Sequence, residues 1–200
     1  MAELRVEDLH PDPVRQFERW FHDAVEAKHL LPEGMTLATA DRNGQPSARV
    51  VLLKGFDEHG FVFFTNYRSR KCRDLEENPR AALCFWWPLV ARQVRIEGTT
   101  APTSAAESDA YFATRPRGSQ IGAWASDQSS TIGDRAILEE RAEEIARRWE
   151  GQPIPRPAHW GGWRLVPEAF EFWENRDDRL HDRFRYTRVP DGWLIDRLAP

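Results

Sequence analysis

The chain has 200 residues, a net charge of −4 at pH 7, 40% hydrophobic residues and 30% charged residues. These values are typical of a soluble globular protein. The length suits one domain over 1–200, with 1–30 as an N-terminal arm and helix, although two small domains would also fit. The acidic balance excludes a general basic surface for nucleic acid or an anionic membrane, so an anion site requires a local cluster of cations.

The cysteines and the N-terminus bear on the cellular compartment. Cys72 and Cys84 are the two cysteines of the chain, and they form neither a C-x-x-C pair nor a spacing typical of metal ligands. The first residues are charged and lack the apolar core of a signal peptide. The longest apolar stretch, 81–91, is too short to span a bilayer. We therefore predict a cytoplasmic protein without a membrane segment.

The first predicted element is an amphipathic helix over roughly 12–30, with Asp12 as N-cap and Pro13 at the first helical position. A short helix is predicted over 68–78, where Pro79 stops it. Strand candidates with short connections surround that helix, and Asn43-Gly44 is a strong hairpin signal. These strands are 35–40, 46–56, 61–66, 80–87 and 91–100. Because no long helix separates them, the pattern favours an antiparallel sheet or barrel.

The second half of the chain mixes helices and strands. Ser104 and Glu107 form a capping-box pattern that predicts a helix over 104–114. The stretch 115–130 is rich in small polar residues, and we expect it to be irregular. A further helix is predicted over 133–151, with its apolar stripe at Ile137, Leu138, Ala142, Ile145 and Trp149. Three strands close the chain, at 163–173 (in one or two pieces), 183–189 and 193–198.

The standard nucleotide-binding motifs are absent: the sequence has no G-x-G-x-x-G and no Walker A motif. The stretch Arg49–Lys54 has four apolar central residues without alternation, which predicts a strand buried on both faces by a second layer, a partner subunit or a ligand. In a regular strand Arg49 and Lys54 point to opposite faces and could serve two anions. The alternative is that both cations mark the strand ends and reach into water.

Three other clusters of cations could carry chemistry. Arg68, Arg70 and Lys71 stand at a predicted helix start, where the helix dipole disfavours cations unless an anion is bound there. Tyr111 and Arg115 share a helix face, and with Ser119 they could clamp a phosphate. If extended, Arg179, His181 and Arg183 share one strand face and require an anion, a ring or solvent opposite. For each cluster an exposed patch without function is the alternative.

Taken together, these segments resemble the pyridoxamine/pyridoxine 5'-phosphate oxidase family. The resemblance extends from about Pro11 to Pro200 through the stretches RVVLLK, FFTNYRSRK, RQVRIEG, YFATRPRGSQIGAWAS, HWGGWRLVPEAFEFW and RLHDRFRY. It implies a mainly β fold with flanking helices, in which an antiparallel split β-barrel binds FMN at a homodimer interface.

The resemblance also implies roles for individual residues. Contacts to the phosphate and ribityl chain of FMN would come from Arg49, Arg70, Lys71, Gln128 and Ser129. The wall against the flavin would consist of Val50, Val51, Leu52, Leu53, Phe64 and Thr65, with Lys54 at the edge of this wall. Groups around the isoalloxazine ring would be Gln93, Trp173 and Arg183. The substrate phosphate would be held by Lys54, Tyr111, Arg115 and Ser119. Arg179 and His181 would lie over the pyridine ring of the substrate, and together with Arg183 they are the candidate catalytic residues.

The implied activity is oxidation of pyridoxamine or pyridoxine 5'-phosphate to pyridoxal 5'-phosphate, by hydride transfer to flavin N5 with O2 as electron acceptor and hydrogen peroxide as product. Two alternatives stay open: a related flavin oxidase of the phenazine-biosynthesis type, and a non-catalytic module that binds flavin or pyridoxal phosphate. The sequence departs from the family pattern in a short N-terminal arm and in Phe64, where a Tyr is common.

Overall fold

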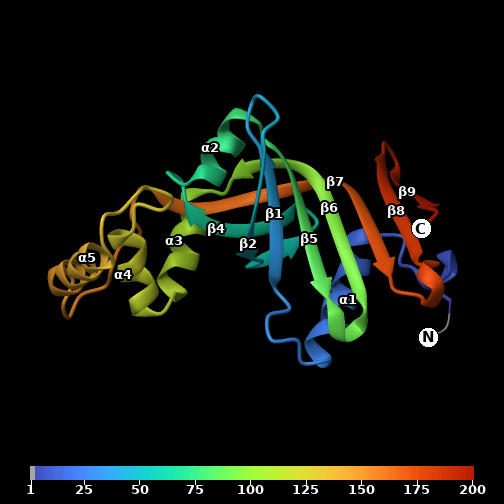
Figure 1. The fold of residues 1–200 in the computed structure, drawn as a ribbon, viewed down its shortest axis with the longest axis horizontal. Helices are drawn as coiled ribbons and strands as arrows, with labels where there is room; N and C mark the ends of the chain where they lie inside the picture. The colour runs from blue at the N-terminus through green and yellow to red at the C-terminus, as the bar shows by residue number, and fades with distance from the viewer. Residues whose placement is uncertain (1–2) are drawn as a thin grey trace.

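A computed structural model describes residues 3–200 and has at its centre a curled antiparallel sheet (Figure 1). The sheet has nine strands in the order β2-β1-β5-β6-β7-β4-β3, and β8 and β9 extend it beyond β7. The predicted fold class, mainly β with flanking helices, is confirmed. The strands are β1 (Gly34–Ala40), β2 (Pro46–Leu52), β3 (Gly55–Asp57), β4 (Gly60–Asn66), β5 (Arg80–Trp87), β6 (Arg92–Pro102), β7 (Trp160–Glu174), β8 (Asp182–Val189) and β9 (Gly192–Arg197).

Helices flank the sheet on several sides. In Figure 1, α3, α4 and α5 project from one end of the molecule, and β8, β9 and both chain termini lie at the other. The helices are α1 (Pro13–Glu26), α2 (Arg70–Glu77), α3 (Ala105–Thr114), α4 (Arg117–Ala125) and α5 (Arg135–Arg148), with short 3-10 turns η1 (Val6–Asp8), η2 (Pro88–Val90) and η3 (Asp177–Arg179). No helix in residues 3–200 is long and apolar enough to cross a membrane.

The core lies between α1 and the concave face of the sheet. Phe17 of α1 is fully buried and makes edge contacts with Phe61 and Phe85, whose ring centroids lie 4.9 Å from its own. Trp20 packs in the same way on Phe172 at 5.2 Å. Such edge-to-face pairs add to the stability from buried area. Helix α1 ends at Glu26, earlier than predicted, because Lys28 adopts a left-handed conformation with φ 58°.

Strand β7 is one continuous strand that changes neighbours along its length. On one side it pairs with β6 from Trp163 onward, and on the other its first part pairs with β4 and its last part with β8. Pro167 lies at an irregularity in the register with β6, opposite Gly98, where the missing amide proton of proline is tolerated. A Cβ atom on Gly98 would come within 2.0 Å of the Val166 carbonyl oxygen, so this crossing requires glycine.

Strand β2 corrects one expectation. It lies at the edge of the sheet and pairs only with β1, and Val50 on its outer face is 67% exposed. Within residues 3–200 no element covers the outer face, so a second layer from the same chain is ruled out there, whereas cover by a partner subunit or a ligand stays a prediction. Lys54 lies beyond the end of β2, so the simple alternation argument for Arg49 and Lys54 does not apply to it.

Two further expectations were wrong, and one helix was confirmed. Residues 117–125, predicted to be irregular, form α4. The helix predicted over 133–151 is α5, and its apolar stripe is partly covered: Ile145 is buried, Leu138, Ala142 and Trp149 are half-buried, and Ile137 is 38% exposed. Residues Arg179 to Arg183 are not one extended segment, since Arg179 closes the turn η3 in a left-handed conformation with φ 62°. Asp177 and Asp178 are residue types that favour turns, and this signal lies just before the stretch that was predicted to be extended.

Candidate active site

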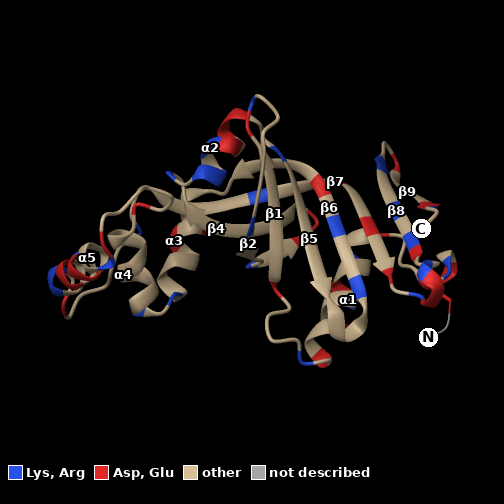
Figure 2. Ribbon diagram, in the orientation of Figure 1, with Lys and Arg blue, Asp and Glu red and all other residues tan. Residues whose placement is uncertain are grey.

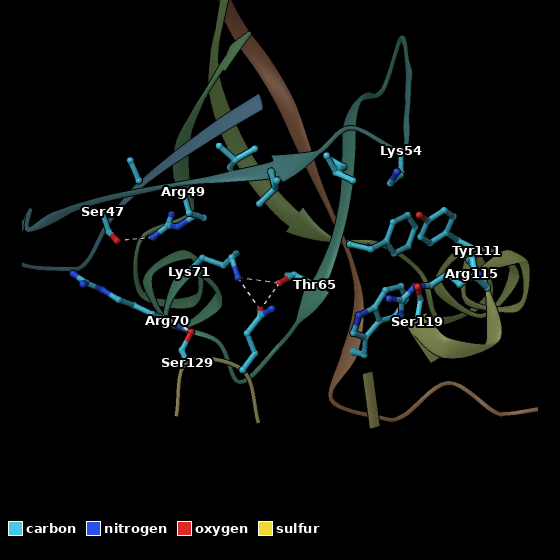
Figure 3. Close-up of a pocket in the computed structure, with 18 of the residues that line it drawn as sticks. Ser47, Arg49, Lys54, Thr65, Arg70, Lys71, Tyr111, Arg115, Ser119 and Ser129 are labelled. Atoms are coloured by element: carbon cyan, nitrogen blue, oxygen red, sulfur yellow. Dashed lines mark hydrogen bonds between the residues drawn. The ribbon is translucent and has the colours of Figure 1, made fainter. Parts of the chain in front are cut away.

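A cavity of about 860 Å³ lies between β2, β4, the N-terminus of α2 and the α3–α4 connection (Figure 3). Residues far apart in the sequence meet here, and one group of cations lies at each end. Its lining is Ser47, Ala48, Arg49, Val50, Val51, Leu52, Lys54, Phe64, Thr65, Arg70, Lys71, Tyr111, Thr114, Arg115, Pro116, Ser119, Gln128, Ser129 and Trp160. Of the residues predicted for this region only Leu53 is absent from the lining, because its side chain is buried in the hydrophobic core.

The first group, here called the Lys71 end, consists of Arg49, Arg70, Lys71, Gln128 and Ser129. The buried Nζ of Lys71 donates to the Thr65 hydroxyl at 3.1 Å and to the Gln128 side-chain oxygen at 2.8 Å. All of its partners are neutral, and no acidic side chain within residues 3–200 forms an ion pair with it. Burial lowers the pKa of Lys71. A buried ammonium without a counter-charge is costly, so this position favours a bound anion.

Helix α2 adds to the same anion site. It begins at Arg70, and the hydroxyl of its N-cap residue Ser69 accepts from Lys71 rather than capping the helix. The backbone N–H of Arg70 donates to the hydroxyl of Ser129, 3.3 Å away, which comes from a distant loop. Two cations in the first helical turn oppose the helix dipole, and an anion at this terminus would reverse the sign of that interaction.

Arg49 is held in place by groups that the sequence did not single out. Its guanidinium donates to the Thr39 hydroxyl at 2.8 Å and to the Ser47 hydroxyl at 2.6 Å. The buried Asp74 accepts a hydrogen bond from Thr39 at 2.6 Å and lies 3.7 Å from the guanidinium. Desolvation lowers the pKa of Arg49, although Asp74 opposes that shift. Only the three-dimensional fold brings β1, β2 and α2 together, so no local pattern could reveal this support.

The second group, the Arg115 end, consists of Lys54, Tyr111, Arg115 and Ser119. Arg115 ends α3, and its guanidinium carbon lies 4.5 Å from the centre of the Trp160 ring. Its Nη1 atom is buried and has no hydrogen-bond partner within the described chain. Burial lowers the pKa of Arg115. An unsatisfied buried donor on a cation points to an acceptor, preferably an anion, in the cavity.

Stacked aromatic rings position the Arg115 end. Tyr111 stacks on Phe64 with centroids 4.0 Å apart, and Phe64 stacks on Trp160 at 5.4 Å. The pair Gly161-Gly162 makes this packing possible, since a Cβ on Gly162 would lie 2.8 Å from the Phe64 ring. Trp160 is a lining residue that sequence reasoning missed; the only available signal was its place in the stretch HWGGW.

The charge balance of the cavity is one-sided. Within residues 3–200, Lys54, Arg70, Lys71 and Arg115 form no salt bridge, whereas most other arginines have an acidic partner. Figure 3 shows the Lys71 end and the Arg115 end on opposite sides of the cavity, with the β2 backbone running between them. The arrangement therefore suits two anionic groups separated by an uncharged middle.

The other predicted residues lie elsewhere on the chain. Gln93, Trp173 and Arg183 are direct neighbours across β6, β7 and β8, and we call them the Trp173 row. The guanidinium of Arg183 pairs with Glu171 at 2.9 Å. The His181 ring lies 4.5 Å from the Trp173 ring, and Arg179 is exposed nearby. None of these residues lines the cavity within the single chain.

A curled antiparallel sheet beside a cavity with cations at both ends defines a class of mainly β proteins whose cavity has room and charge for two anionic groups. The chain belongs, within that class, to the pyridoxamine 5'-phosphate oxidase family, and it is an oxidoreductase. Residues 21–148 match the family described as "Pyridoxamine 5'-phosphate oxidase". Residues 160–200 match the "Pyridoxine 5'-phosphate oxidase C-terminal dimerisation region".

Individual relatives agree with this assignment. A pyridoxine/pyridoxamine 5'-phosphate oxidase of Rubrobacter xylanophilus is 58% identical over 199 residues, which cover 100% of this chain and 92% of the relative. The oxidase of the same name from Acaryochloris marina is 53% identical over 96% of this chain and 88% of its own length. Among solved structures, PhzG from Burkholderia lata, in complex with tetrahydrophenazine-1-carboxylic acid, superposes with a TM-score of 0.94 at 32% identity, covering 100% of this chain and 98% of that one.

Proposed function

We propose that this enzyme oxidises pyridoxamine 5'-phosphate and pyridoxine 5'-phosphate to pyridoxal 5'-phosphate with FMN as cofactor. The observation that carries the proposal is the single cavity with unpaired cations at both ends. One end would hold the phosphate of the cofactor and the other the phosphate of the substrate. The names of the similar enzymes from Rubrobacter xylanophilus and Acaryochloris marina support the same substrates.

The Lys71 end fits the phosphate of FMN. Lys71 and Arg49 supply positive charge, Gln128 and Ser129 supply polar side chains, and the N-terminus of α2 adds the positive end of its helix dipole. The wall formed by residues 50–52 of β2, with Phe64 and Thr65 of β4, would lie along the flavin. Bound FMN would supply a hydride acceptor at N5, and O2 would then reoxidise it with release of hydrogen peroxide.

The Arg115 end fits the phosphate of the substrate. Arg115 has a buried free donor, Lys54 provides a second charge, and the hydroxyl groups of Tyr111 and Ser119 complete a clamp. Burial raises the pKa of Tyr111, so its phenol stays protonated and can donate a hydrogen bond. Holding the phosphate at a fixed distance from the flavin wall would align C4' of the substrate for reaction.

The active protein would be a homodimer in which each site uses residues of both protomers. Residues 160–200 match a dimerisation region. This region contains Arg179, His181 and the Trp173 row except Gln93, which lies on β6. The outer face of the sheet carries the exposed apolar side chains of Val50 and Trp86, which a second copy would cover. Two-fold pairing would bring the row of one protomer to the cavity of its partner.

The candidate catalytic residues would then act from the partner protomer. Arg183 would lie near the flavin ring and stabilise negative charge that develops during reduction. Arg179 and His181 would cover the pyridine ring and exclude water. With the amine substrate, water would hydrolyse the imine product to the aldehyde and ammonia, and with the alcohol the aldehyde would form directly.

A second candidate is oxidation of a phenazine precursor, favoured by the likeness to PhzG of Burkholderia lata. The Arg115 end favours the first function. Its groups suit a phosphate dianion, and a tricyclic carboxylate substrate has no phosphate to place there. A module that binds flavin or pyridoxal phosphate without catalysis would need the cations of the Lys71 end but not those of the Arg115 end.

The test is anaerobic reduction of the purified holoenzyme. Addition of pyridoxamine 5'-phosphate should bleach the flavin absorption band, and admission of O2 should restore it with formation of hydrogen peroxide. A flavin that is bleached only by a dihydrophenazine carboxylate would favour the second candidate. A flavin that no donor bleaches would favour the non-catalytic module, and a protein that takes up no FMN would contradict the proposal entirely.

A further inference from the structure

The loop between β7 and β8 begins and ends at a pair of buried acids. Glu174 and Asp182 are direct cross-strand partners, and each side chain is only 5% exposed. Like charges directly opposite each other on neighbouring strands are destabilising, and burial increases the cost. The loop that they enclose, 175–181, carries Arg179 and His181. Figure 2 shows acidic and basic segments meeting at this end of the molecule, beside the N-terminus.

Arginine side chains compensate these two acids. Arg176, inside the loop, donates from Nε to Asp182 at 2.6 Å and lies 3.5 Å from Glu174 through Nη2, so it bridges the pair. Arg92 donates to Glu174 at 2.7 Å, and Arg197 lies 3.4 Å from Asp182. Burial alone would raise the pKa of Asp182, but the Leu4 N–H and the Arg176 guanidinium hold it below its ordinary value. We call the set Glu174, Arg176 and Asp182 the clasp.

The clasp also fixes the ring of His181. The backbone N–H of Arg176 donates to Nδ1 of His181 at 3.1 Å, and the ring packs on Trp173. A ring nitrogen that accepts a hydrogen bond from a backbone amide carries a lone pair, so in the neutral ring the proton is on Nε2. Within residues 3–200 the Nε2 atom has no partner, which leaves one donor available to a ligand.

We propose that the clasp is a positioning device that presents His181 as a hydrogen-bond donor through Nε2 and withholds Nδ1 from the reaction. His181 then binds an acceptor atom of the substrate and does not remove a proton from it. Arg176 is a positioning residue. Its side chain holds the loop in place through Glu174 and Asp182, and its backbone N–H binds Nδ1 of His181. The identity of the substrate rests on the proposed function, whereas the tautomer of His181 does not.

Nuclear magnetic resonance of the ¹⁵N-histidine-labelled holoenzyme tests the tautomer directly. The measurement is made about two pH units above the ordinary imidazole pKa of about 6.5, and the signal is assigned by its loss in His181→Gln. We expect the proton on Nε2 in the wild type and a mixture of tautomers in Arg176→Met, which keeps the backbone N–H but breaks the clasp. Arg176→Lys should restore the wild-type signal in part, and Arg188→Met, at the far end of β8, should leave it unchanged. A proton on Nδ1 in the wild type, or identical spectra for Arg176→Met and Arg188→Met, would overturn the proposal.

Kinetics of two His181 variants test the consequence without disturbing the clasp. The side-chain amide nitrogen of Gln reaches the position of Nε2, whereas Asn reaches only that of Nδ1. His181→Gln should keep the KM for pyridoxamine 5'-phosphate within about twofold, and His181→Asn should raise it roughly 2- to 10-fold, with kcat less affected in both. Equal KM values, or a lower KM for His181→Asn, would overturn the proposal. If no substrate bleaches the flavin, the proposed function fails while the tautomer measurement still decides the role of the clasp.

Discussion

At the scale of single residues, the chemistry of the cavity depends on cations that lack acids. The chain contains only three lysines, and two of them, Lys54 and Lys71, line the cavity. Lys71 is the more informative because it is buried among neutral oxygen atoms. The sequence could indicate that cations gather near residue 70. It could not show that one of them is buried without a counter-charge, because that depends on Gln128, 57 positions away.

Replacement of Lys71 by Met should change the affinity for FMN and the thermal stability of the FMN-free protein in different ways. We expect the affinity for FMN to fall about 10- to 100-fold, since a charge-assisted hydrogen bond to a phosphate is lost. The melting temperature of the FMN-free protein should stay unchanged or rise, because a buried ammonium without a counter-charge is removed. Fluorescence titration and thermal unfolding measure the two effects. Lys28→Met, at an exposed position, is the matched control, and equal FMN affinity in both variants would contradict the assignment of Lys71.

Replacement of Arg183 by Leu tests its proposed role beside the flavin. Without a fixed cation, charge that develops on the reduced ring is less stabilised, so flavin reduction should slow by about 10-fold or more. Stopped-flow absorbance under anaerobic conditions measures this step apart from reoxidation. Arg185→Leu, two positions further along β8, serves as control. An unchanged reduction rate in Arg183→Leu would reject the role.

At the scale of elements, most strands were predicted from residue patterns, whereas one helix and one turn were not. The alternation in β1 and the Asn43-Gly44 turn were sufficient for the first hairpin. Helix α4 was missed because Gly118, Ser119 and Gly122 have low helix propensity, and tertiary contacts such as the Gln120 side chain to the Phe112 carbonyl, 3.0 Å, compensate. Pro167 suggested a break in β7 that the register irregularity opposite Gly98 avoids.

Gly162 of β7 allows a test of how Phe64 and Tyr111 are packed. In Gly162→Ala the new Cβ would lie 2.5 Å from the Thr103 hydroxyl and 2.8 Å from the Phe64 ring. We expect a loss of about 1–3 kcal/mol in the free energy of unfolding. The KM for the substrate should also rise, because a displaced Phe64 ring would shift Tyr111, which stacks on it. Gly122→Ala, where α4 leaves open space, should instead stabilise by up to about 1 kcal/mol. Chemical denaturation distinguishes them, and equal stabilities would contradict the packing argument.

A buried phenol on strand β8 contributes to the loss of stability at alkaline pH. Tyr186 is fully buried and donates to the His10 carbonyl at 2.8 Å, and burial raises its pKa. Because the pKa is higher in the folded state, this contribution is complete below the unfolded pKa of about 10 and is lost as pH rises above it. Tyr186→Phe should cost about 1 kcal/mol at neutral pH and weaken the loss of stability above pH about 10. Urea denaturation across this range measures it; an equally steep loss in the variant would argue against Tyr186 as the cause.

At the scale of the whole molecule, one chain holds two separate parts of the proposed site. The cavity lies toward α3 and α4, whereas the Trp173 row and the clasp lie near β8 and the N-terminus (Figure 1). The family resemblance placed the residues of both parts in one site. The residue pattern of the sequence could not show that the two parts lie apart within one protomer. The outer face of β2 is likewise exposed in the single chain, and in the proposed homodimer the second subunit would cover it.

Complementation between two variants tests the shared site most directly. At an FMN concentration that loads the wild type but not Lys71→Met, that variant lacks cofactor, and Arg183→Leu reduces its flavin slowly, so each homodimer alone should have little activity. Unfolding the two together and refolding them as a mixture should produce hybrid dimers in which one of the two sites carries neither substitution, and activity should return to about a quarter of the wild-type value. Activity that stays at the level of the separate variants, with hybrid dimers verified by mass spectrometry, would contradict a site built from both protomers.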